Sequence, residues 1–188
     1  MQFYARFQDE VVAAPDLIAA HVQRARANVS DAFRQIFDVQ LVQAHERLTA
    51  EPGSLPAKVR FVTIYHLILE GALGLTTFKF TTDYLAGAGL LPGFVDGYSK
   101  IHHDETRHIG YGVWYLRETV RDHPSQGDTV RETLRDLLPS VAESLAPPAT
   151  GGSHDFAAIG ATSEAIREFA LGGLTRRLDI IGIPLSSL

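Results

Sequence analysis

The sequence predicts an all-α fold in a single domain. Apolar residues recur at helical spacing along the whole chain, and residues that start or stop helices separate the apolar runs. No segment alternates apolar and polar residues between hairpin turns, as strands would. With 188 residues, 45% of them hydrophobic, the chain is long and apolar enough to bury one core.

The first fifty residues are expected to form three helices. Apolar side chains at positions 3, 7 and 11 share one helical face, so a helix is already under way at Met1. A second, amphipathic helix is expected over residues 15–28. A third helix begins at a cap formed by Ser30 and extends to the helix-breaking residues 51–53.

Two long helices follow. The first begins near Ser54 and continues to the glycine-rich break at residues 87–89, and it is the most apolar helix of the chain. The second is opened by residues 91–93 and ends near Asp122, because a proline follows at position 124. The two helices are joined by a short turn, so they are expected to pack as an antiparallel pair.

The C-terminal part is expected to add two more helices. One spans about residues 128–145, and the last runs from Phe156 to about Ile181. Between them, residues 146–153 are rich in proline and glycine and are the one expected flexible linker.

Composition excludes several partners and kinds of site. The net charge is −5, from 17 basic and 22 acidic side chains, and no basic stripe is present to attract nucleic acid or an anionic membrane. The chain has no cysteine, which excludes disulfides, thiolate zinc sites and cysteine-ligated iron–sulfur clusters. Any metal must therefore be bound by carboxylate and imidazole groups.

The sequence also predicts a cytoplasmic location without a membrane span. The N-terminus lacks the basic segment and the continuous apolar run of a signal peptide. The longest apolar stretch, about residues 62–75, is interrupted by Tyr65, His66 and Glu70 and is shorter than the roughly 20 residues that cross a bilayer. We therefore expect it to be a buried helix.

Glu105 and His108 form a Glu-x-x-His motif on the second long helix. Side chains three residues apart lie over one helical face, so these two can converge on one metal ion. The motif alone is weak, because exposed Glu-x-x-His pairs also occur by chance.

Glu70 strengthens the metal hypothesis because it lies in the middle of the most apolar helix. A buried carboxylate costs several kcal/mol unless it is paired, protonated or bound to a metal. The alternative is an acid neutralised by Arg107, Lys79 or His66. His66 is one helical turn before Glu70, from which it could orient the carboxylate.

Together these residues match half of a dimetal site. Four-helix bundles hold two metals with one Glu from each of two helices and a Glu-x-x-His from each of the other two. Glu70, Glu105 and His108 supply one such Glu and one such motif. Hard oxygen ligands combined with imidazole favour iron or manganese.

The segments 33–37, 65–71 and 104–108 resemble ribonucleotide reductase small subunits, and most of all their relatives the ligand-binding oxidases. The resemblance covers about residues 1–120. It implies a ferritin-like helical bundle with an Fe/Fe or Mn/Fe centre that activates dioxygen, bound by Glu70, Glu105 and His108. It also implies that Asp104 accepts a hydrogen bond from a metal-binding histidine of the other half. The alternative for Asp104 is solvent exposure or an ion pair with Arg107.

Tyr65 matches the tyrosine that ligand-binding oxidases cross-link to an aliphatic neighbour during oxygen activation. An ideal α-helix would turn Tyr65 well away from the Glu70 face, so a place near the metal requires a distorted helix. The alternative is a core tyrosine with a hydrogen-bonded hydroxyl. Tyr111 and Trp114 are expected in the core.

The chain departs from the family at two points. The family's other Glu and Glu-x-x-His are not found, and residues 1–4 resemble the stretch that follows them, so we expect the chain to begin just downstream of the missing ligands. A homodimer that joins two half-sites is the other possibility. The last tyrosine is Tyr115, which argues against the radical-transfer tail of a reductase.

The sequence therefore favours a dimetal oxidase or oxygenase that activates dioxygen and attacks a C–H bond. The resemblance implies a fatty-acid-like ligand in an apolar channel near Tyr65, Leu69 and Leu73. Two alternatives stay open, namely the radical-generating small subunit of ribonucleoside-diphosphate reductase and a non-catalytic truncated helical fragment or half-site homodimer.

Overall fold

The computed structural model describes residues 6, 20, 23, 24 and 26 and the continuous stretches 29–146 and 156–188. The helices expected from Met1 and over residues 15–28 lie outside the described residues, as does the expected linker apart from residue 146. The described residues form helices and turns with no strand, so the predicted all-α class is confirmed. In chain order the elements are α3 (Asp31–Arg34), η1 (Gln35–Gln40), α4 (Leu41–Ala50), α5 (Leu55–Val62), η2 (Thr63–Gly74), α6 (Leu75–Gly87), α7 (Pro92–Asp122), α8 (Gln126–Ser144), η3 (Phe156–Ile159), α9 (Ser163–Ile181) and η4 (Leu185–Ser187).

The predicted helix starts at Ser30 and Ser54 are confirmed by their caps. The Ser30 hydroxyl accepts a hydrogen bond from the Phe33 amide at 3.1 Å, and the Ser54 hydroxyl accepts one from the Ala57 amide at 3.4 Å. Each cap satisfies an amide that has no partner inside its own helix. Elements α5, η2 and α6 then join into one continuous helix, as the sequence predicted.

The last helix begins later than the sequence predicted. Phe156 starts only a short 3₁₀ turn, and α9 begins at Ser163. Gly160 adopts a left-handed φ of 68°, which interrupts the helical path. Thr162 is then extended, and its hydroxyl accepts the Ala165 amide at 3.1 Å as the true cap.

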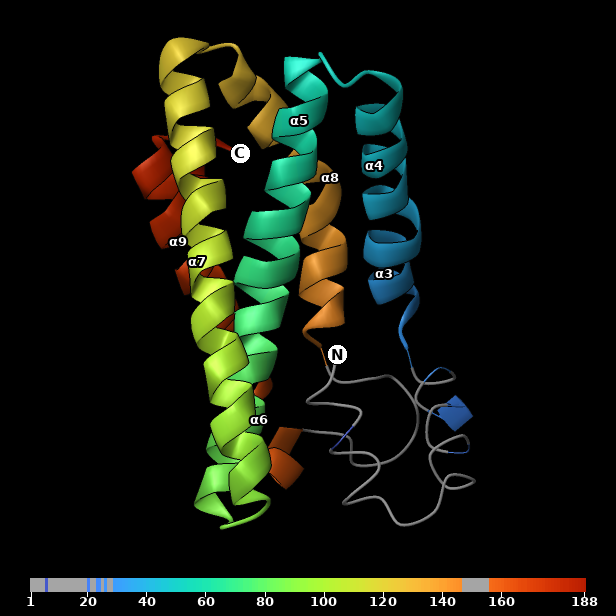
Figure 1. Ribbon diagram of the computed structural model, residues 1–188, viewed down its shortest axis with the longest axis vertical. Coiled ribbons are helices and arrows are strands. Elements are labelled where there is room, and N and C mark those ends of the chain that lie inside the picture. Colours follow the sequence, from blue (N-terminus) through green and yellow to red (C-terminus); the bar gives the residue numbers. More distant parts are fainter. Residues whose placement is uncertain (1–5, 7–19, 21–22, 25, 27–28, 147–155) are drawn as a thin grey trace.

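The long helices form a bundle with η2 at its centre. The continuous helix α5–η2–α6 and helix α7 lie side by side along the long axis, joined by the turn at the α6 end (Figure 1). Element η2 packs against α7, α8 and α9, and the short helices α3 and α4 pack against α8 and α5 respectively. Ile64, Leu67 and Ile68 of η2 are fully buried in this core.

The helix Leu55–Gly87 is the one described helix that is long and apolar enough to cross a membrane, with a mean hydropathy of 1.4 over its most apolar window. In the bundle 56% of that window is buried against other helices. A core helix of a soluble protein has the same properties, and the buried position agrees with the helix that the sequence predicted.

The centre of this helix is a π-helix rather than an α-helix. Its i→i+5 pattern widens each turn, and two glycines accommodate the widening. A Cβ on Gly71 would lie 2.8 Å from the His66 carbonyl oxygen, and one on Gly74 would lie 3.0 Å from the Leu69 carbonyl oxygen. Both carbonyls are five residues earlier, so side chains at these positions would press against the π-helical turn itself.

Candidate metal centre

Glu70, Glu105 and His108 converge in the structure. Glu70 is in η2, and the other two are one turn apart on α7, the neighbouring helix in the bundle. One ligand atom from each residue lies within 4.8 Å of the others. Pairing of the two long helices therefore brings together side chains that are 35 residues apart in the chain.

The separations between these atoms suit one metal ion. The His108 Nδ1 atom lies 3.3 Å from Glu105 Oε2 and 3.6 Å from Glu70 Oε1. Two ligand atoms that each bind one ion at about 2.1 Å, with ordinary tetrahedral or octahedral angles, are roughly 3.0–3.4 Å apart. Small side-chain rotations would bring all three atoms onto a common ion.

The cluster extends from the core to the surface. The exposed fraction of the side chain is 10% for Glu70, 27% for Glu105 and 58% for His108. The carboxylate of Glu70 is therefore the buried end of the cluster, and the imidazole of His108 is the open end.

His66 is the hydrogen-bond partner of Glu70. Its Nδ1 atom lies 2.6 Å from Glu70 Oε2. An ionised carboxylate can only accept, so the imidazole donates through Nδ1–H and fixes one oxygen of Glu70. The other oxygen, Oε1, is the one that faces His108.

The other proposed partners of Glu70 are bound elsewhere. Lys79 pairs with Asp83 at 2.6 Å, and Arg107 pairs with Asp104 at 3.2 Å, both on exposed surface. Among the described residues no lysine or arginine forms an ion pair with Glu70, and its nearest basic side chains are the imidazoles of His66 and His108. The Asp104–Arg107 pair is also the alternative that the sequence left open for Asp104, and the hydrogen bond to a second histidine stays a prediction.

Gly112 allows His66 to reach Glu70. A Cβ on Gly112 would lie 2.3 Å from the His66 Cβ and 2.6 Å from its Cγ. The backbone of α7 thus packs directly on the imidazole, which only a glycine permits. Sequence reasoning missed this residue, because the contact joins two helices and leaves no local pattern.

Tyr65 lies on the same side of its helix as the cluster. In an α-helix, residues five apart point about 140° away from one another, whereas the wider turns of η2 bring Tyr65 toward Glu70. The pKa of the Tyr65 phenol is raised above its ordinary value of 10.0, first by partial burial and then by the negative charges of Glu70 and Glu105. The distorted helix that this placement required is therefore present.

The core interpretation of Tyr65 does not fit the structure. The residue is 38% exposed, and its ring packs on Phe61 at 5.7 Å and against His66 at 5.1 Å between ring centroids. Its catalytic role stays a prediction.

Tyr111 and Trp114 are not in the core, and that prediction was wrong. They are 55% and 51% exposed. Tyr111 is three residues after His108 and follows the ligands onto the open face of α7, where its ring contacts those of His66 and Trp114 at 5.9 Å each. The sequence does not show which faces of α7 are covered by other helices.

The bundle and its cluster define an all-α protein with a carboxylate–imidazole site between paired helices. Its fold is the ferritin-like bundle of the R2-like ligand-binding oxidases, to which the sequence had pointed. Two variant structures of such an oxidase with anaerobically reconstituted Mn/Fe cofactor match at TM-scores of 0.69 and 0.70, with 23% and 22% identity. A third, with aerobically reconstituted Mn/Fe cofactor, matches at a TM-score of 0.69 and 22% identity.

These matches cover 81% of this chain and 53%, 55% and 55% of the three oxidase chains. The chain thus spans about half the length of the solved structures that it matches. No protein-family model matches the chain.

Proposed function

We propose that this chain forms part of a dimetal oxidase that activates dioxygen, with Glu70, Glu105 and His108 as metal ligands. One observation carries the proposal: the largely buried carboxylate of Glu70 faces a Glu-x-x-His pair at metal-binding separations and has no lysine or arginine partner among the described residues. The solved oxidases of this fold contain a Mn/Fe cofactor, and the same metals, or two irons, suit the donor set here.

The residues of this chain have distinct tasks in the proposed site. His66 holds one oxygen of Glu70, which leaves the other directed toward His108. The apolar side chains of η2 keep water from the buried end of the site. When bound, the two metals would supply the reduction of dioxygen and the oxidation of a nearby C–H bond.

Tyr65 is the proposed oxidisable side chain at the site. The π-helix brings it toward Glu70, and the negative charges of Glu70 and Glu105 contribute to its raised pKa. Leu69 and Leu73, each 8% exposed, lie on the same helix. We place a fatty-acid-like ligand beside these three residues, by analogy with the oxidases that the fold resembles.

Three ligands are half of the six that such a centre takes from protein in known bundles. The remaining Glu and Glu-x-x-His would come from further polypeptide or from a second copy of this chain. The exposed imidazole of His108 favours the view that ligands from elsewhere meet the cluster at its open end. A single copy of the chain would lack the full activity. It would gain the missing ligands in a half-site homodimer, and without any partner it would be a non-catalytic fragment. A cytoplasmic location is part of the proposal.

Metal loading tests the proposal directly. The purified chain is incubated with Mn²⁺ and Fe²⁺ without oxygen, desalted, and analysed for metal by mass spectrometry. We expect near-stoichiometric binding that is lost in Glu70→Gln and in Glu105→Gln, which preserve side-chain shape but remove a charged ligand. Asp96→Asn is the matched control on α7, because the ion pair of Asp96 among the described residues is with the exposed Lys100.

Equal metal content in the wild type and in both ligand variants would contradict the assigned ligands. The absence of bound metal in the folded wild-type chain would rule out a half-site homodimer and assign the remaining ligands to further polypeptide. If metal binds, oxygen uptake after aeration tests the oxidase step separately.

A further inference from the structure

A second site lies between α6 and α9, away from the metal ligands. It is an open pocket of about 400 Å³, lined by Lys79, Phe80, Ala165, Glu168, Phe169 and Arg176. None of these residues belongs to the cluster of Glu70. The volume is at the small end of the range of about 300–1,000 Å³ for ligand sites.

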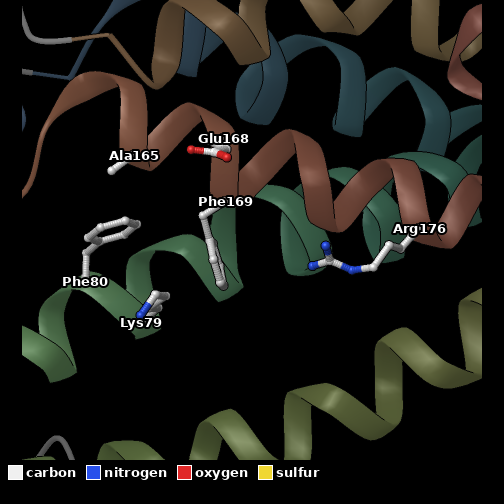
Figure 2. Close-up of a pocket in the computed structure, with 6 residues that line it drawn as sticks. All are labelled: Lys79, Phe80, Ala165, Glu168, Phe169 and Arg176. Atoms are coloured by element: carbon white, nitrogen blue, oxygen red, sulfur yellow. The ribbon is translucent and has the colours of Figure 1, made fainter.

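The walls of the pocket are aromatic. Phe80 of α6 and Phe169 of α9 meet edge to face, with 6.0 Å between ring centroids (Figure 2). Ala165, one turn before Phe169, contributes only a methyl group. The two rings and the small residue leave room for a flat apolar group, which prefers this kind of arrangement with other rings.

One cation at the pocket is already neutralised. The Lys79 ammonium lies 5.7 Å from the Phe80 ring centroid and 5.6 Å from that of Phe169, so it forms cation–π contacts with both rings. Its charge is met by Asp83 at 2.6 Å. Lys79 therefore supports the aromatic walls rather than supplying a free charge.

Arg176 supplies the free charge. Its Nη1 atom lies 3.5 Å from where a Cβ on Gly172 would be, so the side chain folds back along α9 by one turn. Figure 2 shows its guanidinium turned toward Phe169. None of the ion pairs among the described residues includes Arg176 or the lining residue Glu168.

We propose that this pocket binds a small monocarboxylate with an aromatic ring. The ring would lie against Phe80 and Phe169, and the carboxylate would accept hydrogen bonds from the N–H groups of the Arg176 guanidinium. Gly172 is three residues beyond Phe169, about 4.5 Å of helix rise, so a spacer of two or three carbons joins the two contacts. The proposal does not depend on metal binding.

The probe is 3-phenylpropionate, titrated into the full-length chain by calorimetry and by NMR. We expect saturable binding, with the neutral analogue 3-phenylpropan-1-ol at least about tenfold weaker, because it cannot form the charge-assisted hydrogen bonds. Binding that does not saturate, or equal affinity for the alcohol, would overturn the proposal.

Two variants and one control locate the site. Arg176→Gln should weaken binding of 3-phenylpropionate about tenfold or more, and Ala165→Leu should weaken it by filling the pocket from an exposed helical position that tolerates leucine. Arg167→Gln removes an exposed cation of α9 outside the pocket and should leave the affinity unchanged. Equal losses in Arg176→Gln and Arg167→Gln would show a general charge effect and reject the site. Retained circular dichroism in all three variants shows that they fold.

Discussion

At the scale of single residues, the candidate centre is defined by charges that face one another. Glu70 and Glu105 lie near Tyr65, and the only groups that meet the Glu70 carboxylate among the described residues are imidazoles. A bound metal would compensate these charges, which ties the chemistry of Tyr65 to the same two carboxylates.

The raised pKa of Tyr65 makes a prediction for alkaline pH. The folded protein holds the phenol proton more tightly than the unfolded chain, so the stabilisation is complete below the ordinary pKa of 10.0 and is lost as pH rises through the higher folded pKa. The free energy of unfolding should therefore fall above about pH 10, and this part of the fall should vanish in Tyr65→Phe.

The cause of the pKa shift can be tested by titrating the Tyr65 phenol itself. Ultraviolet absorbance of the phenolate isolates Tyr65 as the difference between a protein and its Tyr65→Phe variant. The pKa measured in this way should be lower in Glu105→Gln than in the wild type, because the substitution removes one of the two carboxylate charges that raise it. An unchanged pKa both in that variant and in Glu70→Gln would mean that burial alone raises it and that Tyr65 does not sense the cluster.

At the scale of elements, the site depends on the contact between η2 and α7. Gly112→Ala would place a methyl group 2.3 Å from the His66 Cβ, so α7 must move away from η2. We expect a loss of about 1–3 kcal/mol in the free energy of unfolding, as for other overpacked cores.

Gly110→Ala is the matched control, two residues away on the same helix. Nothing lies within 4 Å of a Cβ at that position, so the helix should gain about 0.5–1 kcal/mol. Urea unfolding with equal slopes compares the two variants. If both variants gained stability alike, the close packing of Gly112 on His66 would be refuted.

Much of the fold and of the candidate site could be predicted from interactions between residues close in sequence. The features that depend on packing between distant segments could not. The serine caps and the glycine-rich break depend on residues that are adjacent in the sequence. The helices beginning near Ser30 and Ser54 could therefore be located. Glu70 and Glu105-x-x-His108 could be paired because one short turn joins their helices. The extent of the π-helix, the contact of Gly112 and the exposure of Trp114 depend on which helices lie opposite, and no short segment encodes that.

At the scale of the whole molecule, the described residues supply three ligands to the proposed centre. The ligands open onto a face of α7 where His108, Tyr111 and Trp114 are each more than half exposed. Exposed aromatic residues beside a cluster of candidate metal ligands are typical of a surface that is covered on assembly. If two chains meet there about a two-fold axis, they combine four glutamates and two histidines around the metals.

This arrangement predicts that metal drives dimerisation. Because metal would bind the dimer far more tightly than the half-site, its addition shifts the equilibrium by mass action. Sedimentation velocity should show a monomer in chelator and a dimer with Mn²⁺ and Fe²⁺, with one dinuclear centre per two chains. Glu105→Gln should stay monomeric with metal, whereas Asp96→Asn should behave as the wild type. A chain that binds metal while monomeric would show that its remaining ligands come from elsewhere, and a dimer insensitive to chelator and to Glu105→Gln would separate assembly from the metal site.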